Sequence, residues 1–146
     1  MTKKIGVLAV QGDFIEHVLM LDKLGVKACE VRLPKDADGL DGLIIPGGES
    51  TTLSHLIDLY DLRECIKTQG SAGMAIWGTC AGMILMAENI PEKRPDTLKL
   101  MDMDVIRNAY GRQVDSFESD VNVDPFDEQP FHAVFIRAPI ISRIGT

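Results

Sequence analysis

Hydrophobic runs alternate with amphipathic segments along the first half of the chain. Residues 5–10 and 43–45 are short continuous apolar runs, which are typical of strands buried on both faces of a sheet. Residues 27–33 alternate between polar and apolar positions and predict a further strand. Residues 13–24 predict a helix, because apolar side chains recur there at helical spacing. The apolar stripe of this helix consists of Phe14, Val18 and Leu21.

The pattern then continues with two helical segments, residues 53–60 and 62–69, and a strand over residues 74–77 that leads into a helix over residues 81–87. Alternating strands and helices predict an α/β fold with three layers, in which helices flank a mostly parallel sheet. The remaining apolar segments predict strands without intervening helices, and we expect them to form an antiparallel extension. These segments are residues 98–106, 116–123 and 131–137.

Length and composition indicate a single domain over residues 1–146. The net charge of −7 disfavours nucleic acid or an anionic membrane surface as the main partner. No apolar run approaches the length of a membrane span, and the N-terminus lacks the core of a signal peptide. Three widely spaced cysteines form neither a disulfide framework nor a metal site, so we expect a cytoplasmic protein without a metal or cofactor.

Cys80 is the candidate nucleophile. It lies in segment 78–82, Gly-Thr-Cys-Ala-Gly, at a predicted strand-to-helix corner. Such a corner holds a nucleophile in a strained turn, and the flanking glycines allow strand and helix to approach closely. The amides at the start of the helix are expected to stabilise a thiolate. The alternative is a buried structural thiol, which is what we expect of Cys29 and Cys65.

A glycine-rich loop, residues 46–51, ends the strand over residues 43–45 and opens a helix. The loop either caps the helix through Ser50 or Thr51, or presents the backbone N–H of Gly48 to the reaction centre of the thiol. It is too short for a phosphate-binding P-loop and lacks the lysine of that motif. Because parallel strands collect ligands at their carboxyl ends, this loop, Gln11 and Cys80 are expected to meet at one edge.

Two arginines, Arg107 and Arg137, lie at or near predicted strand ends. They are either solvated surface residues or partners for a substrate carboxylate, which an arginine can hold by a bidentate pair. Among the histidines, His17 and His55 are expected at the surface, and His132 lies on a predicted strand. None has a carboxylate at a spacing that indicates a catalytic relay.

Five segments together resemble one family from end to end of the chain. They are residues 6–12, 46–51, 78–83, 107–113 and 135–139, in family order. The resemblance is to the PdxT/SNO family, the glutaminase subunits of the two-component pyridoxal 5′-phosphate synthase, which are class I (triad) glutamine amidotransferases. The cysteine corner and the glycine loop are shared with other amidotransferases, whereas the last two segments are more specific to this family.

The resemblance implies that Cys80 attacks the side-chain amide of L-glutamine to form a glutamyl thioester, releasing ammonia and then glutamate. It also implies an oxyanion hole from the N–H groups of Gly48 and Ala81, supported by Gln11. The positions that match the glutamine site of the family are Gly48, Glu49, Ser50, Arg107, Ile136 and Arg137. The implied partner is the (β/α)8 synthase subunit, which receives the ammonia for vitamin B6 biosynthesis and activates the glutaminase on docking.

The family's general base is a histidine followed two residues later by a glutamate, beyond the segment that matches residues 135–139. The 146 residues contain no His-x-Glu. We therefore expect a glutaminase domain without its C-terminal elements and with impaired catalysis, because no base activates the thiol. Two alternatives stay open: a non-catalytic docking module for the synthase subunit, and a cysteine enzyme of the DJ-1/PfpI group.

Overall fold

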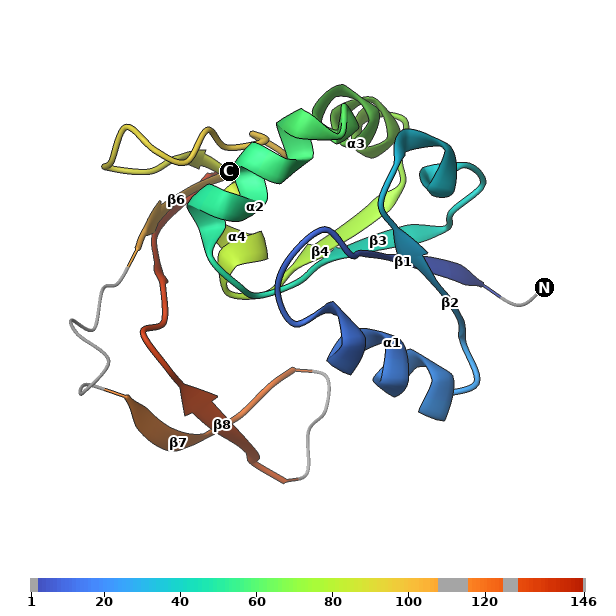
Figure 1. Ribbon diagram of the computed structural model, residues 1–146. Helices are drawn as coiled ribbons and strands as arrows, with labels where there is room; N and C mark the ends of the chain where they lie inside the picture. The colour runs from blue at the N-terminus through green and yellow to red at the C-terminus, as the bar shows by residue number, and fades with distance from the viewer. Residues whose placement is uncertain (1–2, 108–115, 125–128, 146) are drawn as a thin grey trace.

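The central feature of the fold is a four-stranded parallel sheet with the strand order β2-β1-β3-β4 (Figure 1). The computed structural model describes residues 3–107, 116–124 and 129–145. The strands of this sheet are β1 (Lys4–Leu8), β2 (Lys27–Val31), β3 (Gly42–Ile45) and β4 (Ala75–Gly78). All three pairings are parallel, so the predicted α/β class with a parallel sheet is confirmed.

Helices cover both faces of the sheet, as expected (Figure 1). One face carries α1 (Phe14–Lys23), which packs on β1 and β2. The opposite face carries α4 (Ala81–Met86), which packs on β3 and β4 and in turn contacts α2 (Ser50–Leu59). The remaining helices are α3 (Leu62–Ser71) and the 3₁₀ helix η1 (Pro34–Ala37). Within the described ranges, no helix has both the length and the apolar character needed to cross a membrane.

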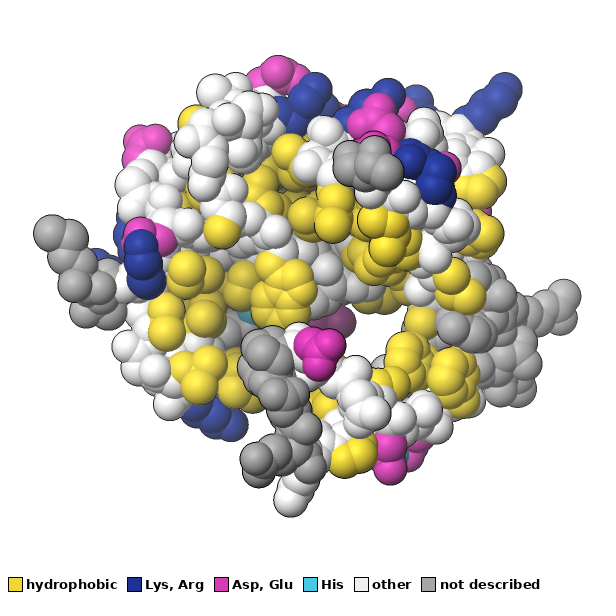
Figure 2. Space-filling model, turned by 180° about the vertical axis from the view of Figure 1, so that it is seen from behind, with side chains coloured by type: hydrophobic (Ala, Val, Ile, Leu, Met, Phe, Trp, Pro, Cys, Tyr) yellow, Lys and Arg dark blue, Asp and Glu magenta, His cyan; other side chains and the backbone are white. Residues whose placement is uncertain are grey.

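The hydrophobic core lies mainly on the side of α2, α3 and α4. These helices bury aliphatic side chains almost completely, among them Leu53, Ile57, Leu62, Ile66 and Leu85. No residue of α1 is fully buried, and its Ile15, Leu19 and Met20 are more than half exposed. Seen from behind, apolar side chains form several patches, and an opening separates the main body from the pair of strands β7 (Phe117–Val121) and β8 (Phe131–Phe135) (Figure 2).

Two small sheets follow the central sheet. One contains β5 (Ala87–Asn89), β6 (Met101–Ile106) and β9 (Ile140–Ile144), and the other pairs β7 (Phe117–Val121) with β8 (Phe131–Phe135). The β7–β8 pairing is antiparallel, as expected. The β6–β9 pairing is also antiparallel, but the sequence analysis did not predict β9, and β5–β6 is parallel. The prediction of an extension is wrong in one respect, because these strands form sheets of their own and do not extend the central one.

Several element boundaries differ from the prediction for local reasons. The helix expected over residues 53–60 begins at Ser50, because the carboxylate of Glu49 accepts hydrogen bonds from the first free N–H groups. The strand expected over residues 98–106 begins only at Met101. Residues 98–100 do not join the strand, because Lys99 has a φ of 52° and the backbone N–H of Leu98 donates to a carbonyl of α4.

Candidate active site

Cys80 occupies a strained corner between β4 and α4, as the sequence predicts. Its φ of 48° and ψ of −105° are unusual for a residue with a side chain. The flanking glycines are required by packing, because a Cβ at Gly78 would lie 2.5 Å from the backbone of Gly82. A Cβ at Gly82 would lie 2.0 Å from the carbonyl oxygen of Ile45. The corner therefore presses strand and helix together and leaves Cys80 exposed.

The thiol of Cys80 is not activated by its surroundings. Its desolvation raises its pKa, and the negative charge of Asp13 acts in the same direction. The backbone N–H of Ala81 donates to the sulfur and opposes this shift without overcoming it. The N–H at the start of the helix therefore favours the thiolate, as expected, but the net shift of the pKa is upward. One favourable N–H does not offset desolvation and a nearby carboxylate.

The glycine loop packs against the end of β1. The side-chain carbonyl of Gln11 accepts a hydrogen bond of 3.1 Å from the backbone N–H of Glu49, which links the two segments. Gly48 has a φ of 152°, and a Cβ there would lie 2.6 Å from the same side-chain oxygen. The contact between Gln11 and the Gly48 backbone requires a glycine at this position.

Glu49 links the glycine loop to α2. Its carboxylate accepts from the backbone N–H groups of Thr51 and Thr52 at 3.1 and 2.6 Å. Desolvation opposes ionisation of Glu49, but these hydrogen bonds outweigh it and hold the pKa of its carboxyl below the ordinary value. The guanidinium of Arg107 lies 3.6 Å from this carboxylate. The loop therefore caps α2, but through Glu49 and not through Ser50 or Thr51 as expected. It also places a charged pair beside the thiol.

One cavity of about 260 Å³ contains Cys80 and all six residues that match the family's glutamine site. Its lining consists of Gly48, Glu49, Ser50, Cys80, Ile84, Arg107, Ile136 and Arg137. Gln11 adjoins the cavity through its hydrogen bond to the backbone of Glu49. Ala81 adjoins it because it follows Cys80 in the chain. The sequence analysis did not single out Ile84, although it lies one helical turn after Cys80 and shares its side of α4. Residues 108–113, part of the segment that carries the resemblance, lie outside the described residues.

A second cavity, of about 520 Å³, also reaches Cys80 and Gly48. The rest of its lining is mostly apolar and comes from α4, from the end of β8 and from the segment that follows β8, with Asp13 as the charged member. Asp13 occupies the N-cap position of α1, but its carboxylate accepts no capping hydrogen bond there. The residue also lines the thiol cavity, where its negative charge acts on Cys80.

The histidines differ from expectation in two of three cases. His17 is half-buried, with Nε2 3.2 Å from the hydroxyl of Thr79 and its ring edge-on to Trp77, and desolvation lowers its pKa. His55 is exposed, as expected. His132 lies 2.9 Å from Asp120 and 3.0 Å from Glu118, which raise its pKa. Sequence spacing did not reveal these contacts, because the partner strand provides both carboxylates.

No histidine lines either of the two cavities that contain Cys80. The other two cysteines are half-buried, and their thiols lie near the backbone carbonyls of Ile5 and Pro34. This agrees with their expected structural role. Among the described residues, no three His, Cys, Asp or Glu side chains are placed to hold a metal ion.

Comparison with known proteins points to one family. The model of the SNO glutamine amidotransferase family matches residues 7–146. A protein of Herpetosiphon aurantiacus named pyridoxal 5′-phosphate synthase subunit PdxT is 55% identical over 144 residues, which are 97% of this chain and 76% of that protein. A protein of Dehalococcoides mccartyi with the same name is 53% identical, over 97% of this chain and 74% of that protein.

Solved structures agree with this assignment. A crystal structure of a glutamine amidotransferase superposes with a TM-score of 0.89 at 44% identity, covering 97% of this chain and 75% of that one. PurLQS from Thermotoga maritima superposes with a TM-score of 0.64 at 16% identity and shares the fold. The matches favour an amidotransferase over the DJ-1/PfpI alternative.

Proposed function

Because the chain belongs to the SNO glutamine amidotransferase family, we propose that it binds L-glutamine in the 260 Å³ cavity and directs the glutamine amide at Cys80. One observation carries the proposal: six positions from three segments far apart in the sequence line a single cavity with the nucleophile. Arg107 and Arg137 provide positive charge for the α-carboxylate of the substrate. Glu49 provides a carboxylate for its α-amino group.

The proposed reaction is acyl transfer to the thiol. The sulfur of Cys80 bonds to the amide carbon, the proton of the thiol passes to the amide nitrogen, the C–N bond breaks, and ammonia leaves. Water then cleaves the thioester and releases glutamate and the free thiol. In the tetrahedral intermediates, the N–H groups of Gly48 and Ala81 are the proposed oxyanion donors. Gln11 holds the glycine loop through its bond to the N–H of Glu49.

We also propose that the 146-residue chain turns glutamine over slowly. It contains no His-x-Glu, and the pKa of the Cys80 thiol is raised, so little thiolate forms at neutral pH. His17 does not replace the base, because its Nε2 faces the hydroxyl of Thr79. Loss of a triad base typically lowers kcat by several orders of magnitude.

The relatives' names suggest the partner. Proteins about half identical to this chain are named subunits of pyridoxal 5′-phosphate synthase, so we propose that the ammonia passes to a synthase subunit, of the (β/α)8 type that the family resemblance implies. A reducing cytoplasm suits this role, since all three cysteines are free thiols.

Glutamate release in the presence of a synthase subunit tests the proposal. We expect glutamine binding, labelling of Cys80 by a glutamine-analogue electrophile, and turnover far below that of a relative containing His-x-Glu. The Cys80→Ser variant is the control for both reactions. Fast turnover that depends on Cys80 would contradict the impairment, and failure of the analogue to label a folded chain would contradict the glutamine site.

The second candidate is a docking module that binds the synthase subunit without producing ammonia. The raised pKa of the Cys80 thiol favours it, because little thiolate is then present to attack glutamine. Analytical ultracentrifugation of the chain with a synthase subunit distinguishes the two. A complex without glutamate release supports the docking module, whereas a folded chain that forms no complex excludes it.

A further inference from the structure

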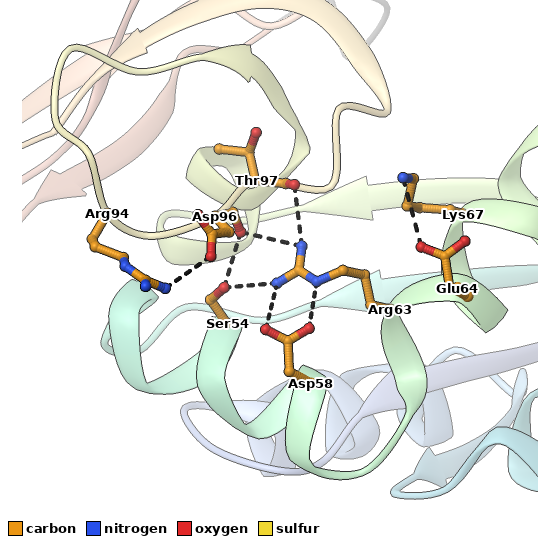
Figure 3. A network of polar contacts seen from close by, with 8 residues as sticks. All are labelled: Ser54, Asp58, Arg63, Glu64, Lys67, Arg94, Asp96 and Thr97. Carbon is orange, nitrogen blue, oxygen red and sulfur yellow. Dashed lines mark hydrogen bonds and ion pairs between the residues drawn. The ribbon is translucent and has the colours of Figure 1, made fainter.

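Arg63, the second residue of α3, lies outside the glutamine cavity but uses every N–H group of its guanidinium (Figure 3). Its Nε donates to the carboxylate of Asp58, and its Nη2 donates to the same carboxylate and to the hydroxyl of Ser54 at 3.2 and 2.9 Å. Both partners belong to α2. A guanidinium has five N–H donors, so two remain for other partners.

The two remaining donors hold the loop between β5 and β6. Nη1 of Arg63 donates to the backbone carbonyls of Asp96 and Thr97 at 3.3 and 3.1 Å. The hydroxyl of Ser54, which is 4% exposed, donates to the carbonyl of Asp96 at 2.9 Å. The loop is thereby fastened to both α2 and α3 (Figure 3).

The same loop holds Arg107 of the glutamine cavity. The backbone carbonyl of Arg94, two residues before Asp96, accepts a hydrogen bond of 2.7 Å from Nη1 of Arg107. The other terminal nitrogen of Arg107, Nη2, is the one that lies near Glu49, the cap of α2. Arg63 and Arg107 thus bind adjacent parts of a four-residue segment, 94–97.

We propose that Arg63 is a positioning residue for glutamine binding, and that it acts through segment 94–97 by fixing the carbonyl that orients Arg107. The inference rests on the proposed function, because it takes Arg107 as a contact of the substrate. A lysine cannot replace Arg63, since an ammonium group has three donors and cannot reach two carbonyls, a hydroxyl and a carboxylate in one plane.

Isothermal titration calorimetry with L-glutamine tests the inference in chains that also carry Cys80→Ser, so that no substrate is consumed. Arg63→Gln is expected to raise the Kd for glutamine about tenfold, as for loss of one well-oriented charged contact. Lys67→Ala is the matched control, because Lys67 lies on the same helix and pairs only with Glu64, at 3.7 Å, among the contacts drawn in Figure 3. The Kd of the Lys67→Ala chain for glutamine is expected to stay within about twofold of that of the parent chain, which carries Cys80→Ser alone.

A double variant separates positioning from general stability. If Arg63 acts through Arg107, Arg63→Gln has little further effect on the Kd in an Arg107→Gln background. An equal loss of affinity in both backgrounds, or an unchanged Kd in the single variant, overturns the inference. Should Arg63→Gln fail to fold by circular dichroism, Ser54→Ala weakens the same link to Asp96 and is judged by the same criterion.

A second readout does not need glutamine. The ¹⁵N-labelled guanidinium of Arg107 is expected to change its Nε–H chemical shift in Arg63→Gln and to keep it in Lys67→Ala. If the parent chain binds no glutamine, the proposed function fails, and this shift alone then decides whether Arg63 orients Arg107. An unchanged shift overturns the inference.

Discussion

Nη2 of Arg107 lies 3.6 Å from the carboxylate of Glu49, and the two side chains line the same cavity as Cys80. Arg107 comes from the end of β6 and Glu49 from the start of α2, so the pair joins the small sheet to the glycine loop. The side chain of Arg107 is 18% exposed and that of Glu49 is 54% exposed. The arginine is therefore the more enclosed partner, which suits the proposed role of fixing a substrate carboxylate.

Replacing Arg107 with lysine is expected to weaken glutamine binding about tenfold or more. A hydrogen bond to a charged group contributes about 1.5–3 kcal/mol. Lysine keeps the positive charge but cannot donate the two parallel hydrogen bonds of a guanidinium. Calorimetry in the Cys80→Ser chain measures the change. Arg94→Lys is the control, because the backbone carbonyl of Arg94 holds Arg107, whereas its side chain is exposed and pairs with Asp96. Equal Kd values for Arg107→Lys and the parent would exclude Arg107 as a ligand contact.

The meeting of the loops was predictable from the sequence, but the details of their connection were not. Short apolar runs indicated where strands end, and parallel strands bring those ends to one edge, so Gln11, Gly48 and Cys80 were expected together. The bond between Arg107 and the carbonyl of Arg94 was not predictable. Backbone carbonyls carry no sequence signal, and the loop that provides this one follows a three-residue strand, β5, which is too short to show a pattern.

The replacement Gly82→Ala is expected to lower the free energy of unfolding by at least about 3 kcal/mol, at the upper end of overpacking costs. The added Cβ would lie 2.0 Å from the carbonyl oxygen of Ile45, and backbone cannot move aside as a flexible side chain can. Gly25→Ala is the control. At Gly25 φ is 70° and nothing lies within 4 Å of an added Cβ, so only backbone strain of about 1–2 kcal/mol is expected.

Urea unfolding followed by circular dichroism measures both glycine variants. Similar losses at the two positions would mean that the close approach of β3 and α4 at Gly82 can relax. That result would contradict the packing reason given for the glycine after the nucleophile.

Asp13→Asn is expected to increase the rate of Cys80 alkylation by iodoacetamide at pH 7 about two- to fivefold. Desolvation is the main cause of the raised pKa of the thiol and is unchanged by this replacement, but the negative charge of Asp13 contributes in the same direction. Removing a nearby like charge lowers a thiol pKa by a fraction of a unit, which increases the thiolate fraction.

The pH dependence of alkylation measures that change, with Asp22→Asn at the other end of α1 as the control. Cys80 must be observed alone, so the variants also carry Cys29→Ala and Cys65→Ala. A rate unaffected by Asp13→Asn, or affected equally by Asp22→Asn, would show that Asp13 does not influence the thiol.

The surroundings of the histidines illustrate what sequence spacing misses. His17 lies on α1, whose partners could not be identified from helical periodicity alone, and its contact with Thr79 depends on how α1 packs beside β4. His132 faces Asp120 directly across the β7–β8 pair, with Glu118 as the diagonal neighbour. Cross-strand pairs depend on register, which is uncertain from sequence when the connection between the strands is long.

The two histidines are expected to contribute to stability with opposite dependence on pH. The pKa of His17 is lowered by desolvation, so the unfolded chain binds a proton more readily. Its contribution is therefore complete above about pH 6.5, the ordinary value, and decreases as the pH falls toward the lowered pKa. The pKa of His132 is raised by Asp120 and Glu118, so its contribution is complete below the ordinary value and is lost as the pH rises through the raised pKa.

Titration of the imidazole carbon-bound protons by NMR tests both assignments in one experiment. His132 is expected to titrate at a higher pH than His17. In Asp120→Asn its midpoint is expected to fall toward the ordinary value, because the hydrogen bond to Asp120 is the main cause of the raised pKa. Asp124→Asn, just beyond the end of β7, is the control and should leave the midpoint unchanged. A midpoint of His132 at or below that of His17 would contradict the placement of His132 between the two carboxylates.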